Sequence, residues 1–335
     1  MKKTLIALAV LAASGAAMAQ SSVTLYGVVD LGIGKMDGGK TQMTSGGVLT
    51  NGNSRIGLRG VEDLGGGLKA GFNFEQGIDA ENGGSLNSVA YGTTGVDANG
   101  RPIVAAGLGW GRAANLWLGG NWGTFKMGRT LTPSYYGLAA YELTGAANYS
   151  VVANTYGFVG AGARNSSQFS YTTPNLGGFS AEVGYIFKAD NANSYKVDAN
   201  AMYVNGPLAV ALSANKVQGG KANYALGGKY SFGNFALATS YQAARNNVYT
   251  NGSLVATGRR QGVSLGGSVA FGAASVTLDV TRDLKHELDG GVKLKKYTNA
   301  VLEAKYALSK RTFVYGDFLR LDSTNNYGFG IRHNF

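Results

Sequence analysis

Hydrophobic and polar residues alternate with a period of two along most of the chain. In ASVTLDVT, residues 274–281, apolar side chains occupy every second position and polar ones stand between them. The segments FSAEVGYIFK (179–188) and NAVLEAKYAL (299–308) show the same period. Such alternation predicts strands with one apolar and one polar face. No run of 18 apolar residues follows the first twenty positions, so no transmembrane helix is expected there.

About sixteen such segments follow one another, and their even number and length of about ten residues suit a membrane barrel. Their ranges are 23–34, 51–62, 67–79, 109–119, 122–131, 164–174, 178–189, 193–205, 207–217, 221–232, 235–245, 258–270, 273–283, 294–308, 311–321 and 325–335. Short turns alternate with longer connections at 35–50, 80–108, 132–163, 246–257 and 284–293. Short turns on one rim and long loops on the other are typical of a barrel whose ends face different compartments.

A soluble β-sandwich, such as a secreted carbohydrate-binding protein, is the alternative fold. Strands of ten residues are long for a sandwich, and the polar faces carry full charges such as Glu182, Lys188, Glu303 and Lys305. Tyrosine and phenylalanine also recur near strand ends, as an interfacial girdle requires. The sequence therefore predicts an all-β protein, a 16-stranded antiparallel transmembrane β-barrel.

The last strand predicts how the barrel closes. Tyr327, Phe329, Ile331 and Phe335 share one face, with His333 among them, while polar or small residues occupy the other. An open strand edge is not tolerated in hydrocarbon. We therefore expect the last strand to pair with the first and its aromatic residues to face lipid.

The first residues have the features of a secretory signal peptide. Lys2 and Lys3 precede an apolar run at 5–13, and the sequence Ala-Met-Ala at 17–19 suits cleavage. The domains expected are therefore a signal peptide at 1–19 and a β-barrel at 20–335. The apolar run is too short for a membrane-spanning helix.

The composition of the chain limits the kinds of partner that it can bind. The formal net charge is +11, and removal of the two lysines in 1–19 leaves +9, but the charges are scattered singly and the protein is exported. Nucleic acid is therefore not an expected partner. The chain has no cysteine, which excludes disulfides and thiolate metal sites. It has 53 glycines and 4 prolines without a collagen period, so an ordered fold must use those glycines.

Four segments together resemble Gram-negative trimeric porins of the beta-proteobacterial general diffusion type. They are QSSVTLYGVVDLGI, SRIGLRGVEDLGGGLKAGFNFE, NLWLGGNWGTFKMGR and the terminal GFGIRHNF. The resemblance implies a homotrimer in the outer membrane that passes small anionic or neutral hydrophilic solutes without a cofactor. It also implies contact with outer-membrane lipid and lipopolysaccharide, and recognition of the terminal aromatic residue by the outer-membrane assembly machinery.

In that family the third long loop folds inward and narrows the pore. Here it should be 132–163, a connection with little charge in which Glu142 is the acidic residue. Related porins place several carboxylates in this loop opposite a cluster of arginines on the wall. The scarcity of carboxylates here indicates a more positive constriction, and hence a preference for anions.

The family's arginine cluster can be placed on this chain residue by residue. Arg55 and Arg59 fall on the lumen face, because the residues that alternate with them are apolar, and Arg164 and Lys126 are expected to point inward by the same reasoning. Arg112 matches the family's position, although alternation with Leu116 and Leu118 would turn it outward. Either a bulge restores its orientation or the assignment is wrong.

Two further positions raise specific expectations. The loop at 80–108 should latch over a neighbouring subunit, as in related trimers. Asp317 lies between Tyr315 and Leu319, on what alternation marks as a lipid face. A carboxylate is costly there, so a subunit interface or a bulge is expected.

The sequence contains little that indicates a catalytic function. The chain has two histidines, His286 and His333, which are too few for a histidine-rich metal site, and no serine has a nucleophile signature around it. We therefore expect no enzymatic activity, no metal and no catalytic residue. An outer-membrane barrel enzyme remains the second functional alternative.

Overall fold

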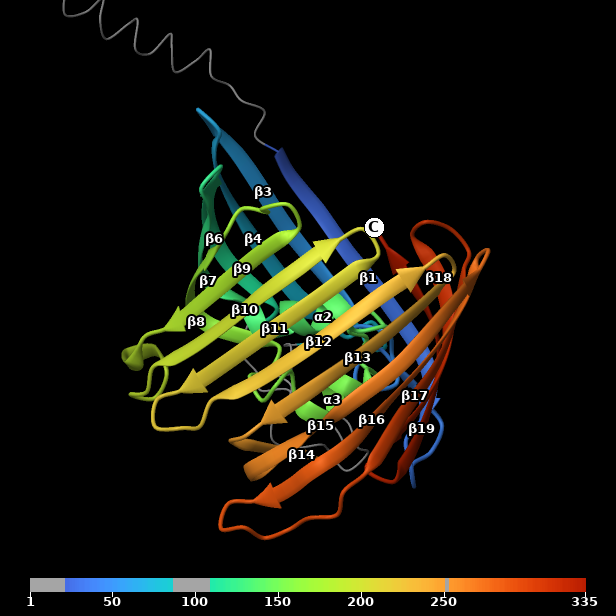
Figure 1. Ribbon diagram of the computed structural model, residues 1–335. Coiled ribbons are helices and arrows are strands. Elements are labelled where there is room, and N and C mark those ends of the chain that lie inside the picture. Colours follow the sequence, from blue (N-terminus) through green and yellow to red (C-terminus); the bar gives the residue numbers. More distant parts are fainter. Residues whose placement is uncertain (1–21, 87–108, 251–252) are drawn as a thin grey trace, which may run out of the picture.

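The computed structural model describes residues 22–86, 109–250 and 253–335. The predicted signal peptide and most of the predicted latching loop at 80–108 lie outside these ranges. Within them, nineteen strands form one sheet, and consecutive strands pair in antiparallel fashion. The sheet closes on itself as a barrel (Figure 1).

Sixteen of the strands make the wall of the barrel, one for each strand predicted from the sequence. They are β1 (Ser22–Lys35), β3 (Arg55–Gly65), β4 (Leu68–Ile78), β6 (Ala113–Gly120), β7 (Gly123–Leu131), β8 (Arg164–Thr172), β9 (Phe179–Ile186), β10 (Lys196–Asn205), β11 (Leu208–Val217), β12 (Asn223–Phe232), β13 (Phe235–Ala244), β15 (Ser253–Phe271), β16 (Ala274–Leu288), β17 (Thr298–Ala307), β18 (Thr312–Leu321) and β19 (Thr324–Asn334). The closed barrel excludes the sandwich alternative.

Three short strands extend the wall at its long-loop end. They are β2 (Gln42–Thr44), β5 (Ser85–Leu86) and β14 (Asn247–Thr250), which pair with β1, β4 and β15. Strands β15 and β16 also continue well beyond their predicted limits of 258–270 and 273–283. The predicted loops 246–257 and 284–293 are therefore largely β-structure.

The last strand closes the barrel as expected. β19 pairs with β1 from Tyr327 opposite Lys35 to Asn334 opposite Val28. The ladder continues to the final residue, since the Phe335 amide donates to the Gly27 carbonyl and Gly27 donates back, both at 3.0 Å. Phe335 is thus held by two backbone hydrogen bonds and is not a frayed end.

The two faces of the wall differ in composition. Large apolar side chains stand exposed on the outside, among them Leu25, Leu116, Leu226 and Phe329. Polar side chains are buried at alternating positions of the same strands, for example Asp30 and Asn115. This arrangement inverts that of a soluble protein and suits a barrel surrounded by lipid.

Residues 132–163, the connection between β7 and β8, carry two helices. In α2 (Pro133–Tyr141), the Thr132 side chain accepts a hydrogen bond from the Tyr135 amide, and in α3 (Val151–Tyr156) the Ser150 side chain caps in the same way. Helix α2 contacts β9 to β12 and α3 contacts β13 to β18, and Figure 1 shows both within the outline of the ring. No helix in the described ranges is long and apolar enough to cross a membrane.

Glycines of the wall allow these helices to approach closely. A Cβ atom on Gly227 would lie 2.3 Å from the ring of Tyr141, and one on Gly262 would lie 2.1 Å from the Tyr156 hydroxyl. No side chain fits at either position. Part of the unusual glycine content therefore serves packing between the wall and the segment 132–163.

The expectation for Asp317 is wrong. Tyr315, Asp317 and Leu319 are all buried on the inner face of β18, where Tyr315 and Leu319 pack with residues of α3. Phe318, in register with Tyr327 of β19, lies on the outer side. The rule that apolar side chains face lipid fails here because the segment 132–163 gives this part of the inner wall an apolar partner.

Replacement of Tyr149 by phenylalanine should loosen the segment 132–163. The Tyr149 hydroxyl donates to Glu303 Oε2 at 2.6 Å and accepts from Asn51 Nδ2 at 2.8 Å, and all three side chains are buried. Loss of a buried hydrogen bond to a charged group costs about 1–3 kcal/mol. We expect a lower urea midpoint and noisier single-channel currents. Tyr306→Phe, on the exposed outer face of β17, is the control and should change neither.

Candidate functional site: a cationic recess on the inner wall

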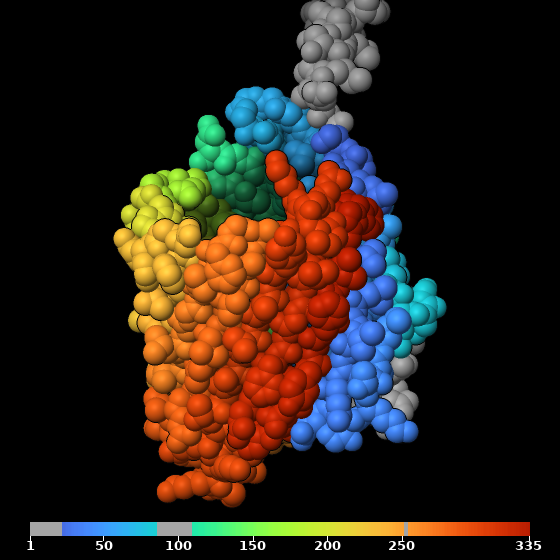
Figure 2. All heavy atoms as spheres, turned by 90° about the vertical axis from the view of Figure 1, so that its right-hand side faces the viewer, coloured from blue at the N-terminus to red at the C-terminus, as the bar shows by residue number. Residues whose placement is uncertain are grey.

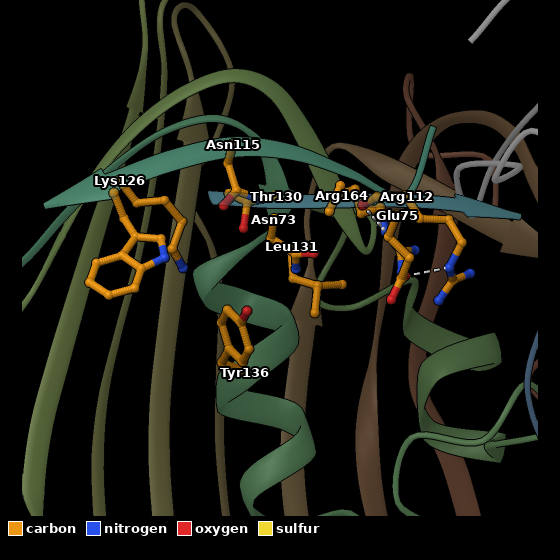
Figure 3. Close-up of a pocket in the computed structure, with 11 residues that line it drawn as sticks. Asn73, Glu75, Arg112, Asn115, Lys126, Thr130, Leu131, Tyr136 and Arg164 are labelled. Atoms are coloured by element: carbon orange, nitrogen blue, oxygen red, sulfur yellow. Dashed lines mark hydrogen bonds and ion pairs between the residues drawn. The ribbon is translucent and has the colours of Figure 1, made fainter. Parts of the chain in front are cut away.

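A cavity of about 250 Å³ lies between the first strands of the barrel and helix α2 (Figure 3). Its charged lining residues are Arg112, Lys126, Arg164 and Glu75. The uncharged lining is Asn73, Ala113, Asn115, Trp117, Thr130, Leu131 and Tyr136. Cations thus outnumber carboxylates among the described residues that line it.

Glu75 of β4 joins two of the arginines. Arg112 Nε donates to Glu75 Oε1 at 2.6 Å, and Arg55 Nε lies 3.3 Å from Oε2. The Tyr26 hydroxyl donates to Oε2 at 3.0 Å and lies 2.9 Å from Asn73 Oδ1. The carboxylate therefore holds two like-charged guanidinium groups side by side, which would otherwise repel each other.

Arg164 adds a third guanidinium. It is the first residue of β8, opposite Leu131, and its Nε donates to the Arg112 carbonyl at 2.9 Å. Near this end of the β7–β8 pair, the register shifts between Gly128 and Thr130 of β7. The extra residue of β8 at this shift interrupts its alternation, and Arg164 nevertheless lines the recess.

Lys126 and Tyr136 form the other side of the recess. The ammonium group of Lys126 lies 5.9 Å from the centre of the Tyr136 ring, in cation–π range. Its charge also acts on the carboxylate of Glu182 on β9. Burial, reinforced by Glu182, raises the pKa of Tyr136 to about 12, so its phenol is neutral at physiological pH.

The structure resolves the orientation of Arg112. β6 begins at Ala113, opposite Glu75, and not at 109 as predicted, so Arg112 lies before the first residue of the ladder. Residues of β6 still alternate, with Asn115 inward and Leu116 outward. Arg112 can face inward because strand alternation does not constrain it, and neither a bulge nor an outward side chain is needed.

Two expected members lie elsewhere. Arg59 stacks over the ring of Tyr26 at 5.2 Å but does not line the cavity. Glu142, the residue after α2, accepts hydrogen bonds from the Thr144 hydroxyl and the Ala146 amide, both at 2.7 Å. It is buried and acts electrostatically on Asp279 and Glu303, on the far side of the segment 132–163.

The structure thus brings together Arg55, Arg112, Arg164 and Lys126, but not Arg59 or Glu142.

Glu75, the carboxylate at the centre of the group, is not among the residues predicted from the sequence. The signal was present, because in GFNFEQ the apolar Phe72 and Phe74 alternate with Asn73 and Glu75. This pattern places Asn73 and Glu75 on the lumen face. The expectation drawn from related porins concerned acidic residues of the long loop, whereas Glu75 belongs to the wall.

The recess favours binding or passage of anions over catalysis. Guanidinium and ammonium groups donate hydrogen bonds to carboxylates and phosphates, and the amides of Asn73 and Asn115 add neutral polar contacts. Among the residues that the structure describes, no group of three or more histidine, cysteine, aspartate or glutamate side chains is arranged to hold a metal.

Comparison with known proteins gives consistent matches along the chain. A sequence model of Gram-negative porins matches residues 4–326. The chain is 34% identical over 354 residues to outer membrane porin protein 32 of Delftia acidovorans, covering 99% of this chain and 93% of that protein. It is 31% identical over 414 residues to an outer membrane porin protein of Bordetella pertussis, covering 100% of both. Among solved structures, an anion-selective porin from Comamonas acidovorans superposes with a TM-score of 0.72 at 27% identity, covering 94% of this chain and 100% of that one.

Proposed function

The chain belongs to the Gram-negative porin family, whose members are outer-membrane channels for passive diffusion, and we propose that this one prefers anions. Ions and small hydrophilic solutes would pass down their gradients through the lumen. No cofactor and no covalent step is involved. The anion-selective porin from Comamonas acidovorans, which shares its fold over nearly the whole chain, supports the preference.

The observation that carries the preference is the convergence of Arg55, Arg112 and Arg164 around one carboxylate, Glu75. Lys126 adds a fourth cation beside the same recess. Cations held together on one wall produce a field across the passage that lowers the energy of an anion and raises that of a cation. Because the arginines are fixed by the wall and by Glu75, their positions are prepared before an ion arrives.

The segment 132–163 is proposed to form the constriction opposite these cations. Its support is the set of contacts that fix it to the wall, such as the Ser134 hydroxyl donating to Asp198 Oδ1 at 2.6 Å and Tyr149 donating to Glu303. In this proposal Glu142 holds the segment in shape, and it acts on the ions only at a distance. The constriction would therefore remain more positive than in a pore with a loop rich in carboxylates.

The assembly is proposed to be a homotrimer, with the loop at 80–108 contributing to subunit contacts. The exposed apolar side chains of β1, Val23, Leu25 and Ile33, supply a surface that either lipid or a neighbouring subunit can cover. The terminal aromatic Phe335 is proposed to act also as the assembly signal. The outward orientation of Tyr327, Phe329 and Ile331 on the same strand is compatible with both roles.

Planar-bilayer recording of the refolded mature protein under a salt gradient tests the proposal. We expect stepwise currents in groups of three and a zero-current potential with the sign of anion preference. Cation preference would refute the role of the arginine cluster while leaving the channel. No conductance from a correctly folded barrel would favour the barrel-enzyme alternative, which hydrolysis assays on phospholipid and peptide substrates would then examine.

Replacement of Glu75 by glutamine should strengthen the anion preference. The change removes the negative charge between Arg55 and Arg112 but keeps a side chain of similar size. Two unit charges about 4 Å apart in water interact by ~1 kcal/mol. The ratio of anion to cation permeability should therefore rise by about fivefold. The zero-current potential measures this. Glu62→Gln, exposed near the β3–β4 turn, is the control, and an equal shift in both variants would contradict the specific role of Glu75.

A further inference from the structure

The recess on the inner wall has two ends of different chemistry. Arg112 and Arg164 form one end, and Figure 3 shows Lys126 on the opposite side of Tyr136 from them. Trp117 and Tyr136 add two aromatic side chains to the same lining. A preference for anions requires only positive charge, so the aromatic part of the recess has no role in it.

The Trp117 ring is supported from behind by the wall. Trp117 points inward from β6, in register with Gly71 of β4 and Lys126 of β7. A Cβ atom on Gly71 would lie 2.4 Å from the indole Cζ2, so the ring lies directly against the β4 backbone. The indole also lines the recess, and a ligand there can contact it. Figure 2 shows green strands of this part of the wall behind a hollow at the short-turn end of the barrel.

Tyr136 of α2 brings a second aromatic ring to the middle of the recess. Its ring centre lies 5.9 Å from the ammonium group of Lys126, and the charge of Arg164 acts on its phenol. Because Lys126 is the register neighbour of Trp117, Tyr136 stands between the arginine end and the indole. A ligand that extends from Arg164 toward Trp117 would therefore pass along this ring.

The carboxylate of Glu182 makes a ring a better match for the Lys126 end than a second carboxylate. Glu182 is buried, and the charge of Lys126 acts on it. A ligand carboxylate at this end would meet the negative charge of Glu182 as well as the ammonium group. An aromatic ring carries no net charge, and a cation near its face attracts it.

We propose that the recess binds monocarboxylates that carry an aromatic ring, with the carboxylate on Arg112 and Arg164 and the ring between Tyr136 and Trp117. Guanidinium groups bind carboxylates through charge-assisted hydrogen bonds, and aromatic rings attract each other in offset or edge-to-face contacts. A cavity of about 150 Å³ admits benzene, so the recess, with about 250 Å³, has room for a ring and a carboxylate. This substrate class rests on the proposed function, because it concerns the same recess.

Block of the chloride current by added carboxylates tests the proposal. The refolded mature protein is recorded in a planar bilayer while acetate, succinate, cyclohexylacetate or phenylacetate is added. Cyclohexylacetate has the charge and nearly the size of phenylacetate but a saturated ring. We expect half-block by phenylacetate at a concentration about fivefold lower than by cyclohexylacetate. Acetate and succinate should block less than either of them.

Variants assign the ring and the carboxylate to their two ends. Trp117→Leu keeps an apolar side chain but removes the aromatic face, so the half-blocking concentrations of phenylacetate and cyclohexylacetate should become nearly equal. Trp117→Phe should keep most of the difference. Arg164→Gln should weaken both ligands alike, because both carry the carboxylate. Trp122→Leu, exposed beside Phe125 on the outer surface, is the matched control and should change neither value. A chloride current from each variant shows that its barrel is folded.

Three results would overturn the proposal. Equal block of the unmodified channel by phenylacetate and cyclohexylacetate would exclude recognition of an aromatic ring. Stronger block by succinate than by phenylacetate would assign the Lys126 end to a second carboxylate. An unchanged preference for phenylacetate in Trp117→Leu would place the ring elsewhere in the lumen. By contrast, cation preference in a channel that phenylacetate still blocks selectively would refute the proposed anion preference and support the aromatic site.

Discussion

Arg164→Glu is expected to reverse the sign of the zero-current potential, from anion to cation preference. The substitution changes the charge beside Arg112 and Glu75 by two units, because a cation is lost and a carboxylate is gained. Each unit contributes ~1 kcal/mol to the energy of an ion at about 4 Å in water. The permeability ratio should therefore fall by more than tenfold. Recording in a salt gradient measures the ratio directly.

Lys229→Glu provides the control for this reversal. Lys229 lies on the inner face of β12, in register with Ala209 and Ala238, and does not line the recess. The substitution changes the charge of the lumen by the same two units outside the recess, where water and salt screen it. We expect only a small shift of the zero-current potential in Lys229→Glu. If both variants shift the potential equally, net lumen charge controls selectivity and the arginine cluster has no special role.

The fold could be predicted from the sequence because a lipid-facing barrel imposes one rule on every strand. Every second residue of a wall strand faces lipid and must be apolar. This pattern can be recognised in sixteen segments of the sequence, in their order along the chain. An unpaired strand edge is not tolerated in hydrocarbon, so the barrel must close. The pairing of β19 with β1 could therefore be predicted, and the structure shows it. The ends of β15 and β16 differ from the predicted limits, because their pairing continues to Ser253 and Leu288, beyond the segments in which apolar and polar residues alternate.

The candidate site was predictable only in part, for reasons visible at single residues. Arg55 belongs to a regular strand, so alternation gives its direction. Arg164 begins β8 beyond a register shift, where alternation with Phe169 does not fix the direction of a side chain. Arg112 lies one residue before β6, and its direction depends on a strand boundary that the sequence does not mark. Alternation gives the wrong face for Asp317 because its neighbours Tyr315 and Leu319 pack against α3, which is distant in sequence.

The buried group around Arg260 carries the largest expected effect on stability. Arg260 Nε and Nη2 donate to Asp283 at 3.0 and 2.9 Å, and Nη1 donates to Asp322 at 3.0 Å and to the Tyr249 carbonyl at 2.6 Å. Arg260 and both carboxylates are buried. The guanidinium group thus joins β15, β16, the short strand β14 and the turn between β18 and β19. These are the elements that form the long-loop end of this side of the barrel.

Arg260→Met should destabilise the barrel by about 3–5 kcal/mol, because it leaves two buried carboxylates without this cation. Urea unfolding of the refolded protein in micelles measures the loss. Arg259→Met is the matched control, since the adjacent side chain points outward and forms only a partly exposed pair with Glu287. It should change the urea midpoint little. Equal effects of the two variants would mean that the burial of the Arg260 group contributes nothing.

The triple variant R260M/D283N/D322N separates the two sources of that loss. Replacing a whole buried ionic group by neutral residues is often close to neutral in stability, whereas removing one partner is costly because charge stays behind. We therefore expect the triple variant to recover most of the stability lost in Arg260→Met. Asn299, whose amide oxygen accepts from the Asp322 backbone at 2.9 Å, would still hold the turn. Failure to recover would show that the hydrogen bonds from Arg260 to the Tyr249 carbonyl and to the turn, and not the balance of charge, stabilise this end of the barrel.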